Sequence, residues 1–237
     1  MTIFRFAIIK GLRNPVTMLF NCIAPILLLL VRSLWVIDGA TSGFGFMSGF
    51  GLMLIVIWGG SFLIAQGTIN DRESGAITRI LSAPISMKNY LAQNLLAYMV
   101  PLTVQVAVIS VLGMILYDWN AALALGLFIC YTVFTIASVT MSFAWNCLFK
   151  RKESAFTTFS AVVTFGSMLG GAFVPIALLP TALQNVGAIF PVFWAMRGIN
   201  ALRELGGAIS TDYMMGLGVM ILFAIAFLLY GGKRRMI

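Results

Sequence analysis

The chain has 237 residues, of which 61% are hydrophobic and 9% are charged. Soluble domains contain about 45–50% apolar residues, so this composition excludes an ordinary soluble domain. Several runs approach ~20 residues without a charge, the length that a helix needs to cross a bilayer. Since backbone polar groups in hydrocarbon must be paired within the segment, and the runs lack strict alternation, we expect an all-α polytopic membrane protein.

The first segment, residues 1–15, carries Arg5, Lys10 and Arg13 between apolar residues. Three charges are too many for a membrane span, so an amphipathic helix on the membrane surface is predicted, ending at the closing proline. A cleaved signal peptide is the competing interpretation. No small-residue cleavage site follows the apolar run 24–31, which disfavours it.

Six apolar runs are predicted to cross the membrane as helices. They cover residues 16–35, 46–68, 91–117, 121–149, 155–173 and 213–230. The chain is thus predicted to be one transmembrane domain over residues 1–237.

Basic residues indicate the orientation, because Lys and Arg accumulate in cytoplasmic loops. With the N-terminus inside, twelve of the 15 basic residues are cytoplasmic, in four groups of three: Arg5, Lys10 and Arg13; Arg72, Arg79 and Lys88; Lys150, Arg151 and Lys152; Lys233, Arg234 and Arg235. Both termini are therefore predicted to be cytoplasmic. Topology and anionic lipid explain the net charge of +8, and no nucleic-acid partner is expected.

A polar stretch, NDRESGAITRILSAPISMKNY (70–90), separates the second and third apolar runs. Asn70 can cap a helix in which Glu73 completes a capping box, and this helix should end before Pro84. The segment predicted to hold this helix covers residues 70–84, and the helix would have its apolar residues on one face and a charged face toward water. Such a helix is either a docking surface for a partner or a capped connector held by lipid headgroups.

Residues 174–205 do not fit a simple span. The apolar piece 182–196 is short and contains Gln184, Asn185 and Pro191. Two short helices that re-enter or lie at the outer interface are therefore predicted. A chain with seven spans is the alternative, and the distribution of basic residues separates the two only weakly.

Four sequence segments carry a family resemblance. DRESGAITRILSAPIS (71–86) resembles the segment after the second span in type-2 permeases of ATP-binding-cassette exporters. GGAFVPIALLPTALQ (170–184) and FPVFWAMRG (190–198) resemble the extracellular re-entrant helices of that family. RNP (13–15) agrees with the end of its connecting helix. The similarity follows the whole chain in order, and the GGAFVPI run is most like the drug, natural-product and antimicrobial-peptide exporters.

The resemblance implies a permease subunit in a bacterial-type inner membrane that exports an amphiphilic small molecule, peptide or lipid. A separate ATPase subunit, in two copies, would hydrolyse Mg-ATP, and a second permease copy or a paralogue would complete the pathway. The segment after Asn70 would be the coupling helix that docks on the ATPase, together with the N-terminal helix. The residues implied in this coupling are Asp71, Arg72, Glu73, Gly75, Arg79, Arg5, Lys10 and Arg13, with Glu73 the first choice.

No catalytic residue, metal ligand or bound cofactor is expected in this chain. None of its lysines follows the G-x-x-x-x-G spacing that cradles nucleotide phosphates. The chain contains no His, which excludes H-E-x-x-H and Ser-His chemistry. Its seven acidic residues lie near predicted interfaces, which disfavours an ion-coupled carrier. A carrier or channel, and a non-transporting membrane scaffold, remain the alternatives.

Large apolar residues and glycines within the spans suggest a cargo cleft and a helix contact. The residues that could line an apolar cleft, or equally pack in the core, are Trp58, Phe62, Phe165 and Met168. Gly166 and Gly170 have the G-x-x-x-G spacing that permits close helix approach. They would serve either a contact within the chain or packing near the two-fold axis of a dimer.

Overall fold

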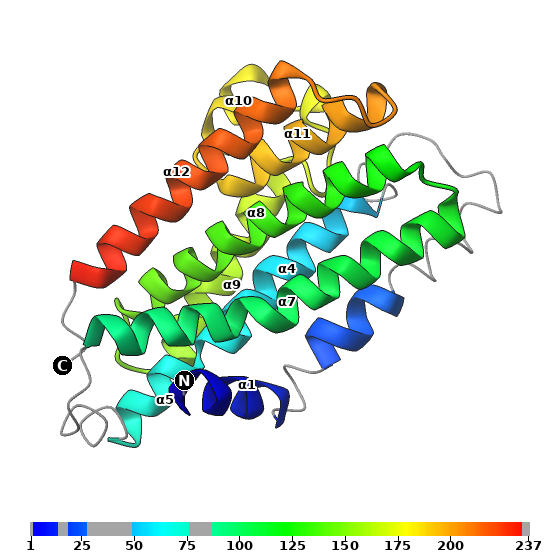
Figure 1. The fold of residues 1–237 in the computed structure, drawn as a ribbon. Coiled ribbons are helices and arrows are strands. Elements are labelled where there is room, and N and C mark those ends of the chain that lie inside the picture. The colour runs from blue at the N-terminus through cyan, green and yellow to red at the C-terminus, as the bar shows by residue number, and fades with distance from the viewer. Residues whose placement is uncertain (1, 14–18, 28–48, 76–86, 234–237) are drawn as a thin grey trace.

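The computed structural model describes residues 2–13, 19–27, 49–75 and 87–233 (Figure 1). All regular structure in these ranges is helical, which confirms the predicted fold class there. The helices are α1 (Thr2–Arg13), α4 (Phe50–Ala65), α5 (Gly67–Glu73), α7 (Met87–Tyr117), α8 (Ala121–Asn146), α9 (Lys152–Leu169), α10 (Thr181–Gly187), α11 (Pro191–Glu204) and α12 (Thr211–Lys233), with a short π-helix at Leu19–Ile23 and a 3-10 turn at Ile176–Leu178.

Four helical stretches in the described residues are long and apolar enough to cross a membrane. They are Phe50–Glu73, Ala92–Tyr117, Ala121–Asn146 and Thr211–Gly231. They match the second, third, fourth and sixth predicted spans. Most of the first predicted span lies outside the described residues, so the count of six stays a prediction.

The fifth predicted span is α9, which is not among those four helices. It has 18 residues and begins with Lys152 and Glu153. It also carries several hydroxyl side chains, and these lower its apolar character. The prediction of an ordinary apolar span is therefore not supported for this helix.

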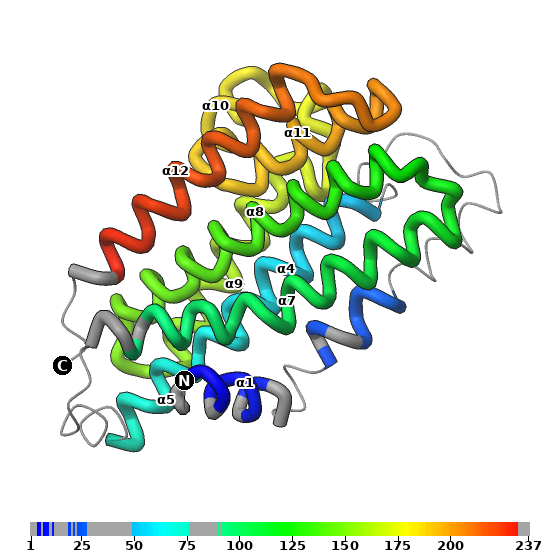
Figure 2. Tube along the Cα trace, viewed as in Figure 1, coloured from blue at the N-terminus to red at the C-terminus, as the bar shows by residue number. Residues whose placement is uncertain are grey.

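Helix α8 occupies the centre of the bundle. It contacts α4, α7, α9, α11 and α12, and Figure 2 shows it running between α7 and α12. Leu127, Phe134 and Ala137 on α8 are completely buried. The outward faces of α7 and α12 expose apolar residues such as Val104 and Leu222, as expected where a helix meets lipid.

The two ends of the bundle differ. Figure 1 shows α1 and α5 at one end and α10 with α11 at the other. At the α11 end, the side chain of Asn120 caps α8 by accepting a hydrogen bond from the Leu123 amide at 2.7 Å. The Asn120 amide group also donates to the Gly206 carbonyl at 2.8 Å. This one side chain therefore ties the start of α8 to the turn that follows α11.

The two short helices predicted within 174–205 are α10 and α11. Gly187 at the end of α10 lies against the Leu169 carbonyl at the end of α9, so the segment folds back onto the bundle. Whether it re-enters a membrane stays a prediction.

A close backbone contact joins α4 to the segment after α9. A side chain at Gly51 would overlap the Ala172 carbonyl, whereas Gly218 of α12 faces open space. We expect Gly51→Ala to lower the free energy of unfolding by about 1–3 kcal/mol because the backbone must shift. Gly218→Ala, which adds the same methyl group, should leave stability unchanged or raise it slightly. Thermal unfolding of the two purified variants in detergent measures the difference, and equal stability would contradict this packing.

Candidate functional site

The end of the bundle that the sequence predicts to be cytoplasmic gathers α1, α5, the start of α7 and the end of α8 (Figure 1). A second hydrophobic cluster, separate from the main core, joins α1, α4, α7 and α8 here through Ala7, Ile64, Tyr90, Tyr98 and Phe143. The predicted ATPase-coupling residues that the structure describes lie at this end, so it is the candidate site.

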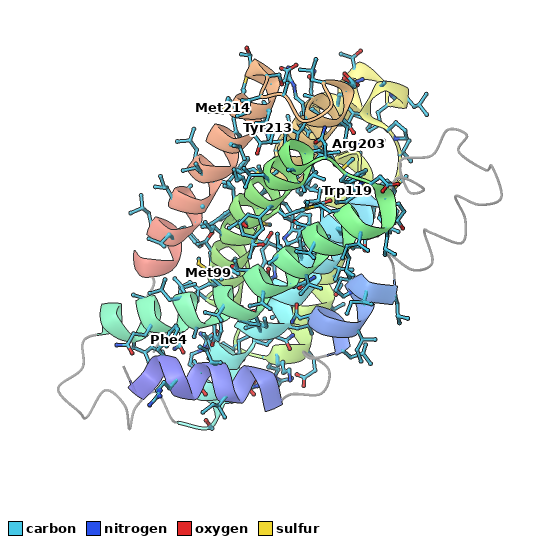
Figure 3. All side chains as sticks on the ribbon, turned by 45° about the vertical axis from the view of Figure 1, so that its right-hand side comes forward. Phe4, Met99, Trp119, Arg203, Tyr213 and Met214 are labelled. Atoms are coloured by element: carbon cyan, nitrogen blue, oxygen red, sulfur yellow. The ribbon has the colours of Figure 1, made fainter. Side chains whose placement is uncertain are left out.

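Helix α1 packs along the first turns of α7. Phe4, Ala7 and Ile8 belong to the second hydrophobic cluster, and the Phe4 amide donates to Gln93 Oε1 at 3.3 Å. Figure 3 shows Phe4 on the side of α1 toward α7. Arg5 is exposed. The helix predicted for residues 1–15 is thus present from Thr2 to Arg13, and its position on a membrane surface stays a prediction.

The helix at the start of the polar stretch begins earlier than predicted. Asn70 does not start a helix, because it lies inside α5, which runs from Gly67 to Glu73 and continues the line of α4. Ile69 is completely buried, and this burial extends the helix past the position at which a cap was predicted. The helix ends at Glu73, and Gly75 has a φ of 66°, a conformation that favours glycine after a helix. Residues 76–86, which include Arg79, lie outside the described residues.

Asp71 bonds to α7 within the chain. The Tyr90 hydroxyl donates to Asp71 Oδ2 at 2.9 Å. Burial and the adjacent Asp71 carboxylate both raise the pKa of Tyr90, so the hydroxyl keeps its proton and remains a donor across the physiological range. A hydrogen bond to an ionised acceptor is stronger than one between neutral groups.

Arg72 caps the end of α8. Its Nη2 atom donates to the carbonyl of Asn146 at 2.9 Å and to the carbonyl of Phe149 at 2.7 Å. The last carbonyls of a helix have no partner within the helix and carry a partial negative charge. A cation is therefore well placed here, and Arg72 binds α8 to α5.

The predicted coupling residues differ in how exposed their side chains are. Glu73 is exposed at the end of α5, and Arg5 is exposed on α1. Asp71 and Arg72 are half-buried and bonded within the chain. The side chains of Lys10 and Arg13 are not among those described. Of the three consecutive residues Asp71, Arg72 and Glu73, only Glu73 is exposed.

The four residues predicted to line a cargo cleft do not meet. Trp58 is 0% exposed and Phe62 is 2% exposed. Phe62 stacks on Phe159 with ring centroids 4.1 Å apart, so α4 uses these rings to pack against α9. Phe165 and Met168 are 64% and 50% exposed on the outer side of α9. The single chain does not bring the four side chains together, because one pair is buried and the other is exposed. A cargo cleft that uses these residues stays a prediction.

Gly166 and Gly170 serve contacts within the chain. A Cβ at Gly166 would lie 2.9 Å from carbon atoms of Trp58 and Phe190. A Cβ at Gly170 would overlap the side chain of Val192. Both glycines are buried, so the described contacts are those within the chain, and packing near a dimer axis stays a prediction.

The opposite end holds a cavity that sequence reasoning missed. It has a volume of about 420 Å³ and is lined by Phe50, Trp119, Leu123, Asn200, Arg203 and Glu204. The Arg203 guanidinium lies 4.7 Å from the centre of the Phe50 ring, and Trp119 stacks on Phe50 with ring centroids 5.3 Å apart. Figure 3 shows Trp119 and Arg203 close together at this end. Arg203 is one of three basic residues outside the cytoplasmic groups, which was the available signal.

The stacked rings between α4 and α9 allow a direct test of the core assignment. Phe62→Ala should lower the free energy of unfolding by about 3–5 kcal/mol, because it removes the ring that stacks on Phe159. Leu222→Ala removes a large apolar side chain from an exposed position on α12, and its effect should stay within about 0.5 kcal/mol. Thermal unfolding in detergent gives both values, and a larger loss for Leu222→Ala would contradict the packing described.

Comparison with known proteins places this arrangement in a family. A model of the ABC-2 family transporter proteins matches residues 37–232. The linearmycin resistance permease protein LnrN of Bacillus subtilis is 24% identical over 180 residues, which are 75% of this chain and 45% of that protein. The chain thus spans less than half the length of this relative. The family match covers most of the chain and includes all four apolar membrane helices, so this chain is a membrane protein that belongs to the ABC-2 family of transporters.

Proposed function

We propose that this chain is the permease subunit of an ATP-driven exporter for an amphiphilic antimicrobial compound, peptide or lipid. The family match over residues 37–232 carries the proposal. The similarity to a resistance permease supports an antimicrobial cargo and outward transport. In this proposal two ATPase subunits bind Mg-ATP outside this chain, and both termini lie on the cytoplasmic side.

The positions of the carboxylates support an energy source outside the chain. In the described part of the chain they all lie at helix ends or in connections: Asp71, Glu73, Asp118, Glu153, Glu204 and Asp212. Carriers driven by protons or sodium keep ionisable groups inside the membrane, where such groups are costly and therefore functional. The arrangement seen here fits transport driven by a partner better than ion coupling.

Glu73 is the best-placed residue for binding the ATPase. It is exposed at the end of the helix Phe50–Glu73, within the segment 71–86 that resembles the coupling region of the family. A carboxylate in this position can pair with a basic residue of the partner. Arg5 on α1 is exposed at the same end and extends the surface.

Glu73→Arg tests the docking surface. Like charges brought together across an interface cost several kcal/mol, so we expect about tenfold or greater loss of the co-purified ATPase subunit. Glu204→Arg makes the same charge change at the exposed opposite end and should leave co-purification unchanged. The tagged permease is purified from its native host in mild detergent, and the ATPase is quantified by mass spectrometry. No co-purified nucleotide-binding subunit with the unchanged permease would contradict the proposed function.

Helix α9 supplies a surface for a second permease chain. Its exposed face mixes hydroxyl and apolar side chains: Thr157, Ala161, Thr164, Phe165 and Met168. The hydroxyls of Thr157 and Thr164 donate to carbonyls one turn earlier, at 3.0 and 2.9 Å. The exposed face of α12, by contrast, is apolar at Ile221, Leu222, Ile225, Leu228 and Leu229. The mixed face of α9 fits contact with a second copy or paralogue better than contact with lipid.

Cysteine crosslinking tests this dimer surface. Thr164→Cys should form a covalent dimer on mild oxidation in membranes, because both copies would present this position at the two-fold axis. Leu222→Cys places a thiol on the exposed face of α12 and should remain monomeric. The native cysteines are the same in both variants, so gel electrophoresis of the two samples isolates the new thiol. Dimers from Leu222→Cys and none from Thr164→Cys would contradict the assignment.

A further inference from the structure

Helices α4 and α5 form one long helix, Phe50–Glu73. Gln66, the residue between them, has helical backbone angles of φ −57° and ψ −19°. A Cβ at Gly67 would lie 3.1 Å from the Tyr98 hydroxyl, so α7 passes close to the start of α5. The last residues of α5 lie beyond this close contact.

Three consecutive residues at the end of α5 point in three directions. Successive residues of an α-helix are rotated by about 100° around its axis. Asp71 accepts from Tyr90 of α7, and Glu73 is exposed. Arg72 donates to the last carbonyl of α8 and to a carbonyl just beyond that helix. The side chains of Asp71 and Arg72 thus connect α5 sideways to two membrane helices.

The side chains of Asp71 and Arg72 are poorly suited to bind a partner, because their hydrogen bonds within the chain already engage them. Arg72 is half-buried, and the carbonyls that it binds belong to Asn146, the last residue of α8, and to Phe149, just beyond it. A partner that recruited Arg72 would leave these carbonyls without their cation, at the end of the helix where one is favoured. A partner that recruited Asp71 would have to compete with the Tyr90 hydroxyl.

We propose that Asp71 and Arg72 form a mechanical joint inside the permease that carries displacement of α5 into α7 and α8. The inference rests on the proposed ATP-driven function and names the residues that transmit its motion. Glu73 then receives the force, and Asp71 and Arg72 are positioning residues that pass it on. Helix α8 extends the connection to the opposite end, where Asn120 binds Gly206 beside the cavity.

Two variants break the joint without altering the exposed docking residue. Tyr90→Phe removes one hydroxyl and keeps the ring, and Arg72→Gln removes the charge that caps α8. Arg151→Gln is the control, since it removes an exposed basic side chain at the same end of the bundle. Each permease is purified with its ATPase, and amide hydrogen exchange is measured by mass spectrometry with and without ATP and vanadate.

The expected result separates docking from transmission. Both joint variants should bind the ATPase as the unchanged permease does. The nucleotide-dependent change in exchange around residues 118–120 should fall by about tenfold or more, as expected when a hydrogen bond to a charged group is lost. Arg151→Gln should keep the change. Exchange without nucleotide shows whether each variant is folded, and Tyr90→Phe gives the milder test.

Three results would overturn the inference. Loss of the ATPase from both joint variants would mean that Asp71 and Arg72 belong to the docking surface. A nucleotide-dependent change that persists in both variants would mean that force travels by another route. If the unchanged permease binds no ATPase, the proposed function itself fails, and the joint fails with it.

Discussion

Capping of α8 at both ends is the interaction on which the arrangement of the other helices depends. Hydrocarbon offers no partner to the free backbone groups at helix ends, so their bonds must come from the chain or from the interface. Asn120 binds the first turn of α8, and Arg72 binds its last carbonyls. Each cap also reaches a second segment, Gly206 beyond α11 in one case and α5 in the other. The central helix therefore connects the two ends of the bundle.

The residues that match the ABC-2 family include α8 and the helices that pack on it. One end of α8 lies beside the exposed Glu73, and the other end lies beside the cavity that Arg203 lines. In the proposed exporter, the ATPase acts at the first of these places and cargo leaves near the second. Between these two places the aromatic rings of α4 and α9 pack against each other, and the opposite face of α9 is exposed.

The sequence predicted the helices well where a polar break interrupts an apolar run. Asp118, Trp119 and Asn120 separate α7 from α8 as predicted. The predicted start of the helix in the polar segment was wrong, because burial of Ile69 outweighed the capping signal of Asn70. The partners of Arg72 lie 74 and 77 residues away in the sequence, beyond any local pattern. Trp58 and Phe62 lie in a nearly continuous apolar run, whose periodicity cannot tell an inward face from an outward one.

Export that depends on the partner's ATP hydrolysis is the property to measure first. Bacterial cells sensitive to amphiphilic antimicrobial compounds would express this permease with its ATPase, either intact or with the phosphate-binding lysine of that ATPase replaced. The amount of each compound of a panel that the cells retain is then measured by mass spectrometry. We expect at least one compound to accumulate less in cells with the intact pair than in cells with the inactive ATPase. Equal accumulation of every compound in the two kinds of cell would show that this permease does not use the partner's ATP to export such compounds.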